Sequence, residues 1–319
     1  MTRKTTIAVA SLFGLLAAGS FAAEKTYTFG IVAKSNNNPV FQAAKTGAED
    51  EAKALGEKNG VTIKIDWRTP NEEDPQKQVE AIETLVNAGA NGIAVSASDA
   101  NKLTDAINAA VAKGVPVVCF DSDVPKSKRL ANFGTDDIDC GNKVMAELAK
   151  EMNGKGVVAI LAGNQNAPNL QKRVAGVKEE AKKSAGIKII DTYYHKETPQ
   201  DAAAKVEQVM QAHPEITGWA MVGGWPLFTD NALKFSPGSV KVVAVDALPA
   251  ELGYLRDGHV QVLLAQQVYE WGTESVKMLY DKAANHKNPP SSFVKADLIP
   301  VTKSNVEEFA KNWEKWLPK

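Results

Sequence analysis

Val117-Val118-Cys119-Phe120-Asp121-Ser122-Asp123 is the stretch that decides the fold. Its first four residues are apolar, and acidic and hydroxyl side chains follow them directly. A continuous apolar run of this kind is typical of a strand in a parallel sheet, because both faces of such a sheet are covered. In open α/β sheets the ligand lies just outside the carboxyl ends of the strands. We therefore expect Asp121 to lie at a ligand site.

A second stretch, Val242-Val243-Ala244-Val245-Asp246, has the same form. Along the whole chain, apolar segments of strand length alternate with segments of helical pattern, such as the helix expected from Pro39 to Gly56. The last helix is expected over residues 305–316. This alternation is typical of βαβ units in a doubly wound parallel sheet. The sequence thus predicts an α/β protein with two similar halves that face one another.

The first 22 residues have the pattern of a cleavable signal peptide. Arg3 and Lys4 give a positive start, and residues 7–18 form an apolar stretch that is short for a membrane span. Ser20-Phe21-Ala22 places small residues where a signal peptidase reads them, so we expect cleavage after Ala22. No cysteine that could carry a lipid anchor stands nearby. The mature protein is therefore expected to be exported, most simply to a bacterial periplasm.

The charge of the chain is nearly balanced. Its 319 residues carry a net formal charge of −1, and Lys and Arg are spread along the sequence. A chain of this length can bury a large core and fits two domains. Because no basic excess is present to neutralise phosphates, nucleic acid is not an expected partner.

Cys119 and Cys140 are the only cysteines in the sequence. In an oxidising compartment they could form a disulfide. The alternative is that both are small buried apolar side chains. The sequence leaves both possibilities open, since it does not show whether the two Cα atoms come within about 7 Å of each other.

No segment carries a catalytic or metal-binding signature. The four histidines stand at spacings that do not suit a metal site. There is no Walker loop, no G-x-S-x-G and no G-x-G-x-x-G after an expected strand. The expected activity is therefore binding without a cofactor, a metal or an enzymatic reaction.

Polar side chains at the expected strand ends suit a ligand that carries many hydroxyl groups. Asn38 offers both a donor and an acceptor, and Phe41 could cover the apolar face of a sugar ring. The alternatives are helix capping for Asn38 and core packing for Phe41. Asp121 and Asp246 can each accept from two adjacent hydroxyls, although either could instead cap a helix or join a salt bridge. Two carboxylates in matching positions favour a ligand.

Four further side chains are candidates with an alternative explanation for each. Trp67 and Trp225 directly follow expected strands, where an indole could stack on a sugar or simply pack in a loop. Arg173 lies early in an expected helix and could donate to ring oxygens, although a lone helical arginine is usually solvated. Gln266 ends an expected strand and could contact a ligand or satisfy the backbone of a hinge.

Taken in order, these residues resemble the periplasmic sugar-binding proteins of the ribose-type ABC transporter family over nearly the whole mature chain. The resemblance is carried by Asn37–Phe41, Gly114–Asp121, Ala212–Glu215, Val242–Asp246 and Ala265-Gln266. It implies the periplasmic binding protein type I fold, with two Rossmann-like lobes and a hinge of three crossings. The N-terminal lobe would comprise residues 23–135 and 267–297, and the C-terminal lobe residues 136–266 and 298–319.

The resemblance also implies where a ligand would be held. Asn38, Phe41 and Asp121 would contact it from the N-terminal lobe, Arg173 and Asp246 from the C-terminal lobe, and Gln266 from the hinge. The chain departs from the ribose pattern at Ser122-Asp123, where ribose binders carry an arginine, and at Gly223-Gly224-Trp225, where they carry an Asn–Asp pair. Lys34 and Asp121-Ser122-Asp123 are similar to the rhamnose and autoinducer branch. We therefore add Lys34, Ser122, Trp67 and Trp225 to the expected contacts.

The expected function is that of a monomeric, exported solute-binding protein of an ABC importer. It would bind a monosaccharide or polyol in the cleft between the lobes, close around it and dock on an inner-membrane ABC permease. The alternative is a periplasmic binding protein that reports a sugar or an autoinducer to a chemoreceptor or sensor kinase. A repressor core shares the fold, but the export signal and the missing helix-turn-helix headpiece argue against one.

Overall fold

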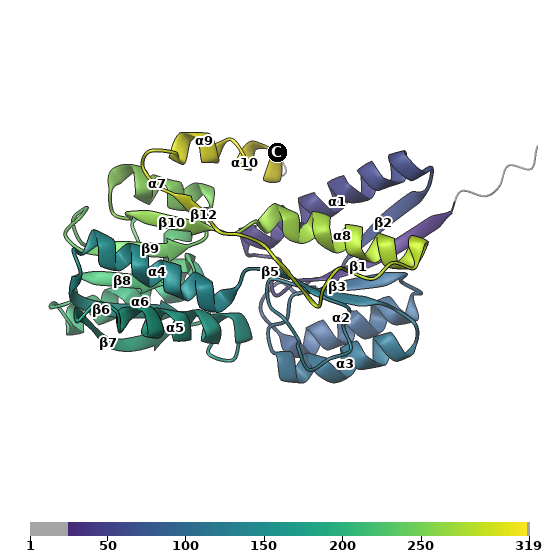
Figure 1. Ribbon diagram of the computed structural model, residues 1–319, viewed down its shortest axis with the longest axis horizontal. Helices are drawn as coiled ribbons and strands as arrows, with labels where there is room; N and C mark the ends of the chain where they lie inside the picture. Colours follow the sequence, from purple (N-terminus) through teal and green to yellow (C-terminus); the bar gives the residue numbers. More distant parts are fainter. Residues whose placement is uncertain (1–24, 318–319) are drawn as a thin grey trace, which may run out of the picture.

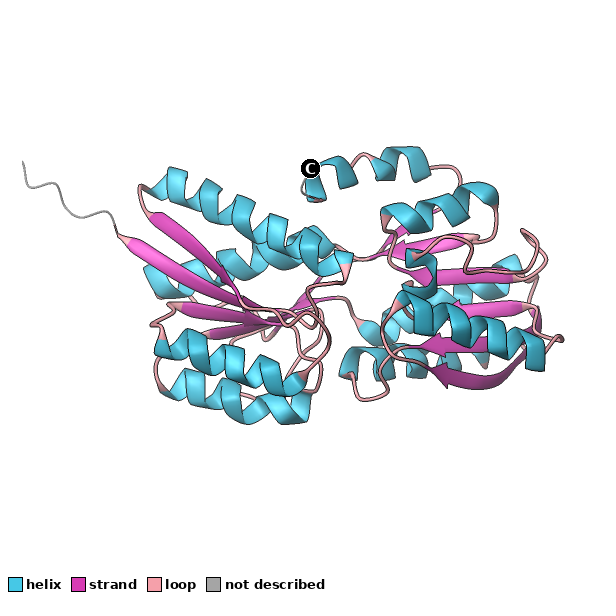
Figure 2. Cartoon of the chain, turned by 180° about the vertical axis from the view of Figure 1, so that it is seen from behind, coloured by secondary structure: helices cyan, strands magenta, loops and turns pink. Residues whose placement is uncertain are grey.

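The chain folds into two α/β lobes that lie side by side (Figure 1). The computed structural model describes residues 25–317, so the expected signal peptide lies outside the described residues. In each lobe a central sheet is covered by helices on both faces, as the view from behind shows (Figure 2). The doubly wound fold that the apolar strands predict is confirmed.

The sheet of the first lobe has six parallel strands in the order β11-β5-β4-β3-β1-β2. The central strands β3 and β4 are buried along their whole length, as expected for apolar strands covered on both faces. The strands are β1 (Thr26–Val32), β2 (Thr62–Trp67), β3 (Gly92–Val95), β4 (Val117–Phe120), β5 (Asn132–Gly134) and β11 (Phe293–Lys295).

The sheet of the second lobe repeats this plan in the order β12-β10-β9-β8-β6-β7. Only the edge strand β12 runs antiparallel, to β10, among the pairings of the described residues. The strands are β6 (Lys155–Ala162), β7 (Gly186–Tyr194), β8 (Gly218–Met221), β9 (Lys241–Val245), β10 (Val262–Ala265) and β12 (Ile299–Val301).

Helices cover both faces of each sheet. In the first lobe α1 and α8 pack together on one face, and α2 and α3 on the other. In the second lobe α4 and α5 cover one face, while α6, the 3-10 turn η1 and α7 cover the other. The helices are α1 (Pro39–Asn59), α2 (Pro75–Asn87), α3 (Ala100–Ala112), α4 (Asp137–Glu151), α5 (Pro168–Ala181), α6 (Pro199–Ala212), η1 (Trp225–Phe228), α7 (Pro249–Asp257) and α8 (Val268–Asn285).

Local sequence explains where many of the helices begin. Asn38, Asp74, Asp99, Asp136 and Thr198 each accept a hydrogen bond from a backbone N–H of the first turn of the following helix. A side-chain oxygen at this position satisfies a donor that the helix itself leaves free. Each of these caps follows a strand, so these five helices start at the carboxyl ends of the sheets.

The chain passes between the lobes three times, after β5, after β10 and after β11. The first two crossings are joined by a hydrogen bond. Thr135 Oγ1, after β5, donates to Gln266 Oε1, after β10, over 3.3 Å. The predicted boundary residues of the two lobes stay a prediction. Of the described helices, none is long and apolar enough to cross a membrane.

The single terminal helix expected over residues 305–316 is wrong. The segment forms two short helices, α9 (Val306–Ala310) and α10 (Trp313–Trp316). Their aromatic side chains are drawn to different neighbours: Trp313 Nε1 donates to the carbonyl oxygen of Ala247 over 2.8 Å, while Trp316 stacks on Tyr269 of α8. Tertiary packing thus breaks a helix that local pattern alone would continue.

The sequence leaves a disulfide between the two cysteines open, and the structure shows both of them free. Cys119 belongs to β4 of the first lobe and Cys140 to α4 of the second, and they lie in separate hydrophobic clusters. Burial raises the pKa of each thiol to about 12. The alternative, two inert buried apolar side chains, is the one that the structure shows.

Candidate ligand-binding site

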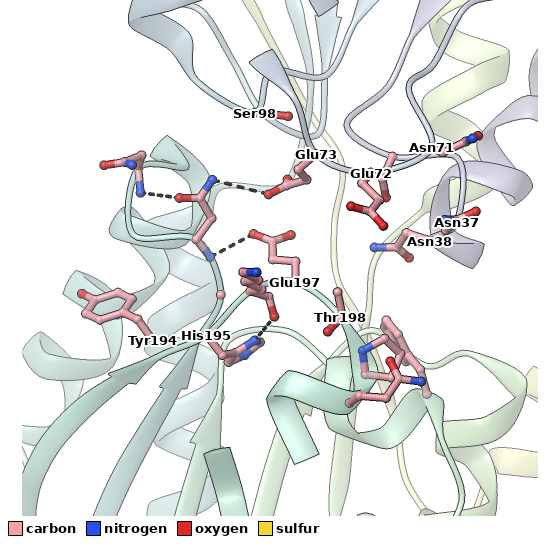
Figure 3. A pocket seen from close by; sticks show the side chains of 18 of the residues that line it. Asn37, Asn38, Asn71, Glu72, Glu73, Ser98, Tyr194, His195, Glu197 and Thr198 are labelled. Atoms are coloured by element: carbon pink, nitrogen blue, oxygen red, sulfur yellow. Dashed lines mark hydrogen bonds between the residues drawn. The ribbon is translucent and has the colours of Figure 1, made fainter. Parts of the chain in front are cut away.

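A cleft of about 970 Å³ opens between the lobes (Figure 3). Its walls are loops that follow β1, β2 and β3 in the first lobe and β6 and β7 in the second. The site therefore lies at the carboxyl ends of both sheets, as the strand pattern predicts. Polar lining residues include Asn37, Asn38, Glu72, Glu73, Ser98, Asn164, His195, Glu197 and Thr198.

Asp121 and Asp246 occupy equivalent positions in the two lobes. Each directly follows a buried strand, β4 or β9, and each side chain is buried. Both also have a left-handed backbone, with φ of 54° at Asp121 and 82° at Asp246. This conformation is uncommon for residues other than glycine and often marks a functional position. The match extends the similarity of the two halves from sequence to backbone geometry.

Asp121 links the two lobes through Asn169 of α5. Asn169 Nδ2 donates to Asp121 Oδ1 over 3.1 Å, and Ser96 Oγ donates to Asp121 Oδ2 over 2.7 Å. Lys34 Nζ lies 3.8 Å from Asp121 Oδ2 and donates to Asn169 Oδ1 over 3.3 Å. These direct hydrogen bonds hold the first lobe to the second, although none of the four residues lines the cleft itself.

Lys34 keeps its charge although it is buried. Burial by itself lowers the pKa of Lys34, but the neighbouring carboxylates of Asp121, Glu197 and Glu73 outweigh it and raise the pKa above its ordinary value. A charged ammonium group therefore stands beside Asp121 at neutral pH.

Arg173 organises the second lobe's part of the site and is only 2% exposed. Its Nε donates to Asp137 Oδ1 over 2.9 Å, and its Nη1 donates to the carbonyl oxygen of Val222 over 3.1 Å. Its Nη2 donates to Gln266 Oε1 over 2.7 Å. Helix α4 packs directly against the backbone of α5 at Gly141, because glycine has no side chain. A Cβ at this position would overlap the carbonyl oxygen of Arg173.

Gln266 connects Arg173 to Asp246. Its Nε2 donates to Asp246 Oδ1 over 2.8 Å, so its amide is oriented by Arg173 on one side and Asp246 on the other. Burial raises the pKa of Asp246, against the lowering effects of Arg173 and Gln266. The carboxylate, the amide and the guanidinium form one buried polar network at the end of β9 and β10.

The remaining predicted residues of the first lobe lie in different surroundings. Asn38 lines the cleft and also caps α1, with Oδ1 accepting from the N–H of Val40 over 3.2 Å. Ser122 is completely buried, and its Oγ has no hydrogen-bond partner among the described residues. Phe41 packs against Phe120 and Trp271 in the core, with ring centroids 6.5 and 6.0 Å away.

The two candidate tryptophans support loops around the cleft. Trp67 Nε1 donates to Asn36 Oδ1 over 3.0 Å, which fixes the loop after β1. Trp225 is buried and meets the ring of His195 edge to face at 5.1 Å. His195 lines the cleft, so Trp225 lies directly behind one of its walls. The contact of a ligand with Phe41, Trp67 or Trp225 stays a prediction.

Three residues of the site were not predicted from the sequence. Asn169 stands one helical turn before Arg173, on the same face of α5, so the helical period could have indicated it. Glu73 and Glu197 lie in loops on opposite lobes, and no local pattern points to them.

Glu73 and Glu197 face each other across the cleft (Figure 3). Asn164 joins them, because its backbone N–H donates to Glu197 Oε1 over 3.1 Å and its Nδ2 donates to Glu73 Oε2 over 3.4 Å. Burial and the charge of Glu197 raise the pKa of Glu73 to about 8, although Lys34 and the Asn164 hydrogen bond act in the other direction. Within residues 25–317, no group of three or more His, Cys, Asp or Glu could hold a metal ion.

The model of the periplasmic binding protein domain matches residues 29–287 of the chain. This protein belongs to the periplasmic binding protein domain family. The D-allose-binding periplasmic protein of Escherichia coli is 28% identical over 294 residues, which cover 88% of this chain and 91% of that protein. The ribose import binding protein of Bacillus subtilis is 25% identical over 245 residues, or 76% and 77% of the two chains. The predicted family is confirmed.

Solved structures with the same fold confirm the two-lobed architecture. An ABC transporter solute binding protein from Burkholderia graminis, in complex with D-arabinose, superposes with a TM-score of 0.81 at 28% identity. The superposition covers 88% of this chain and 96% of that one. A glucose-galactose binding protein from Geobacillus stearothermophilus, at 24% identity and a TM-score of 0.80, shares the fold.

Proposed function

We propose that this protein is the solute-binding component of an ABC importer and that it holds a monosaccharide or polyol between its lobes. The observation that carries the proposal is the pair Asp121 and Asp246, two buried carboxylates with matching backbones, one at a strand end of each lobe. Ionised acceptors make strong hydrogen bonds to hydroxyl groups. The relatives named for D-allose and ribose, and the neighbour with bound D-arabinose, support a sugar as the ligand.

Closure of the lobes would complete the site. Asp121, Asn38 and Lys34 belong to the first lobe, while Asp246, Arg173 and Asn169 belong to the second. A ligand shifts the open-to-closed equilibrium only by its differential affinity for the closed form. Hydroxyl groups that bond to both lobes at once supply that difference. Gln266, beside a crossing, would join the ligand site to the hinge.

The closed monomer would then dock on an inner-membrane ABC permease and release the sugar unchanged. Export through the signal peptide expected in residues 1–22 would place the protein in the periplasm. Import is favoured over the alternative of sensing, because relatives named for import match over most of their lengths. Arg173, Asp137 and Gln266 would act as the rigid support of the second lobe rather than as catalytic groups.

A thermal-shift screen tests the function. Pentoses, hexoses, deoxysugars, sugar alcohols, inositols and autoinducer are each added to the purified mature protein. A ligand present at about 100 times its Kd adds about 2.7 kcal/mol to the stability of the native state. For a chain of this size we expect at least one sugar or polyol to raise the Tm by roughly 5 °C.

Amino acids at the same concentrations serve as the control panel and should leave the Tm unchanged. A response to an amino acid with none to any sugar or polyol would contradict the proposed function.

A further inference from the structure

The cleft carries an acidic cluster that a neutral sugar leaves unexplained. Glu73 of the first lobe and Glu197 of the second both line the cavity, and Asn164 donates to each of them. Figure 3 shows both carboxyl groups directed into the cavity. Two acidic side chains from opposite lobes are thus brought together in the wall of the cavity.

Two polar atoms of this wall have no partner among the described residues. Glu73 Oε1 and Ser98 Oγ are both buried and unbonded, and the Ser98 side chain is completely buried. Ser98 lines the same cleft as Glu73, and both are labelled in Figure 3. Buried polar groups in proteins are nearly always hydrogen-bonded, so these two atoms are available to a polar group of a ligand.

The charges around the cleft do not balance. Asp121 has Lys34 as its counter-ion, and Asp137 has Arg173. Within the described part of the chain, Glu197 and Asp246 have no cationic partner within 4 Å. Glu73 has none either, although its raised pKa keeps it largely neutral without a ligand. The charge of Lys34 acts on Glu73 and Glu197 from a greater distance. His195 adds no charge at neutral pH because burial lowers its pKa, and Lys196, which also lines the cleft, is exposed. The unmatched charge is negative.

On the basis of the proposed function, we propose that the ligand carries a protonated amine and that Glu73, Glu197 and Ser98 receive it. The ligand class would be an amino sugar or an amino polyol. An ammonium group has three N–H donors and no acceptor. It would satisfy Glu73 Oε1 and Ser98 Oγ while it neutralises the carboxylate pair, and the hydroxyl groups of the same ligand would reach Asp121 and Asp246.

Protonation of Glu73 provides a specific signature of this binding mode. Glu73 faces Glu197, Lys34 and Asp121, and its raised pKa of about 8 means that it is mostly protonated at about pH 7 in the ligand-free cleft. A bound ammonium group would lower this pKa and release the proton. The affinity for a protonated amine should therefore rise between about pH 6 and pH 7, because less free energy is then needed to remove the proton from Glu73. A neutral sugar would not release it.

Isothermal titration calorimetry with matched pairs tests the proposal. The probes are D-glucosamine and D-glucose, D-galactosamine and D-galactose, glucamine and sorbitol, and an amino-inositol with its parent inositol. In at least one pair the amine is expected to bind about tenfold more tightly or better, the lower end for one hydrogen bond to a charged group. Its binding enthalpy should also vary with the ionisation enthalpy of the buffer, which reports the released proton.

Three variants locate the effect. Glu73→Gln should abolish proton release, and Glu73→Gln, Glu197→Gln and Ser98→Ala should each reduce the preference for the amine. Glu57→Gln, an exposed carboxyl of α1, should change neither. Neutral probes that bind as tightly as their amines in every pair would overturn the inference and leave the proposed function standing. Binding of no sugar, polyol or amine at all would overturn both.

Discussion

Replacing Arg173 by methionine is expected to lower the free energy of unfolding by about 3–5 kcal/mol, the usual cost of breaking a buried ion pair by removing one partner. Arg173 neutralises Asp137 and also donates to Gln266 and to the carbonyl oxygen of Val222. Without it, Asp137 becomes a buried carboxylate with no counter-ion. Urea unfolding of the ligand-free protein, followed by circular dichroism, measures the loss.

An exposed arginine pair gives the matched control. Arg256 donates to Glu307 through both Nε and Nη2, and both side chains are exposed. Arg256→Met should therefore cost less than about 1 kcal/mol. Adding Asp137→Leu to Arg173→Met should recover part of the stability, because the uncompensated charge is then gone. Equal losses for Arg173→Met and Arg256→Met would show that the buried network does not support the second lobe.

Replacing Asp121 or Asp246 by alanine is expected to weaken binding of the ligand by at least about 1.5–3 kcal/mol, or roughly 10- to 150-fold. Each variant removes charged acceptors from one lobe, and Asp121→Ala also removes the bond to Asn169 that joins the lobes. Calorimetric titration with the tightest sugar from the thermal-shift screen measures both losses.

Asp123 provides a nearby carboxylate as a control. It follows Asp121 by two residues but forms an ion pair with Arg129 and makes no bond to the second lobe, whereas Asp121 accepts from Asn169. Asp123→Ala should bind the sugar with unchanged affinity. Unchanged affinity in both Asp121→Ala and Asp246→Ala would remove the two carboxylates from the site.

The fold could be predicted because its information is local. Val117–Phe120 and Lys241–Val245 are apolar and covered on both faces, and aspartate or asparagine caps announce several of the helices. The same logic placed Asp121 and Asp246 at the carboxyl ends of parallel strands, while their contact with a ligand stays a prediction. Local pattern fails where tertiary contacts determine the secondary structure, as they do for the terminal segment that forms two short helices, α9 and α10.

The rest of the site depends on distances between segments far apart in the chain. For aromatic residues the sequence does not distinguish a ligand contact from core packing. The position of Phe41 after a strand suits either, and in the structure Phe41 joins the core. The sequence also does not show whether Cys119 and Cys140 can form a disulfide, since only the fold reveals that they belong to different lobes. Glu73 and Glu197 meet only when two loops are brought together across the cleft.

Ligand-driven closure of the two lobes is the central claim, and single-molecule FRET tests it most directly. One label is placed on α2 through Glu83→Cys and the other on α5 through Lys178→Cys, both exposed positions. The native Cys119 and Cys140 are buried and should not react with the dyes. Saturating sugar is expected to shift the population to a single state with a changed inter-dye distance, and Asp246→Ala should need more sugar for the same shift. A sugar that binds by calorimetry but leaves the FRET distribution unchanged would contradict closure.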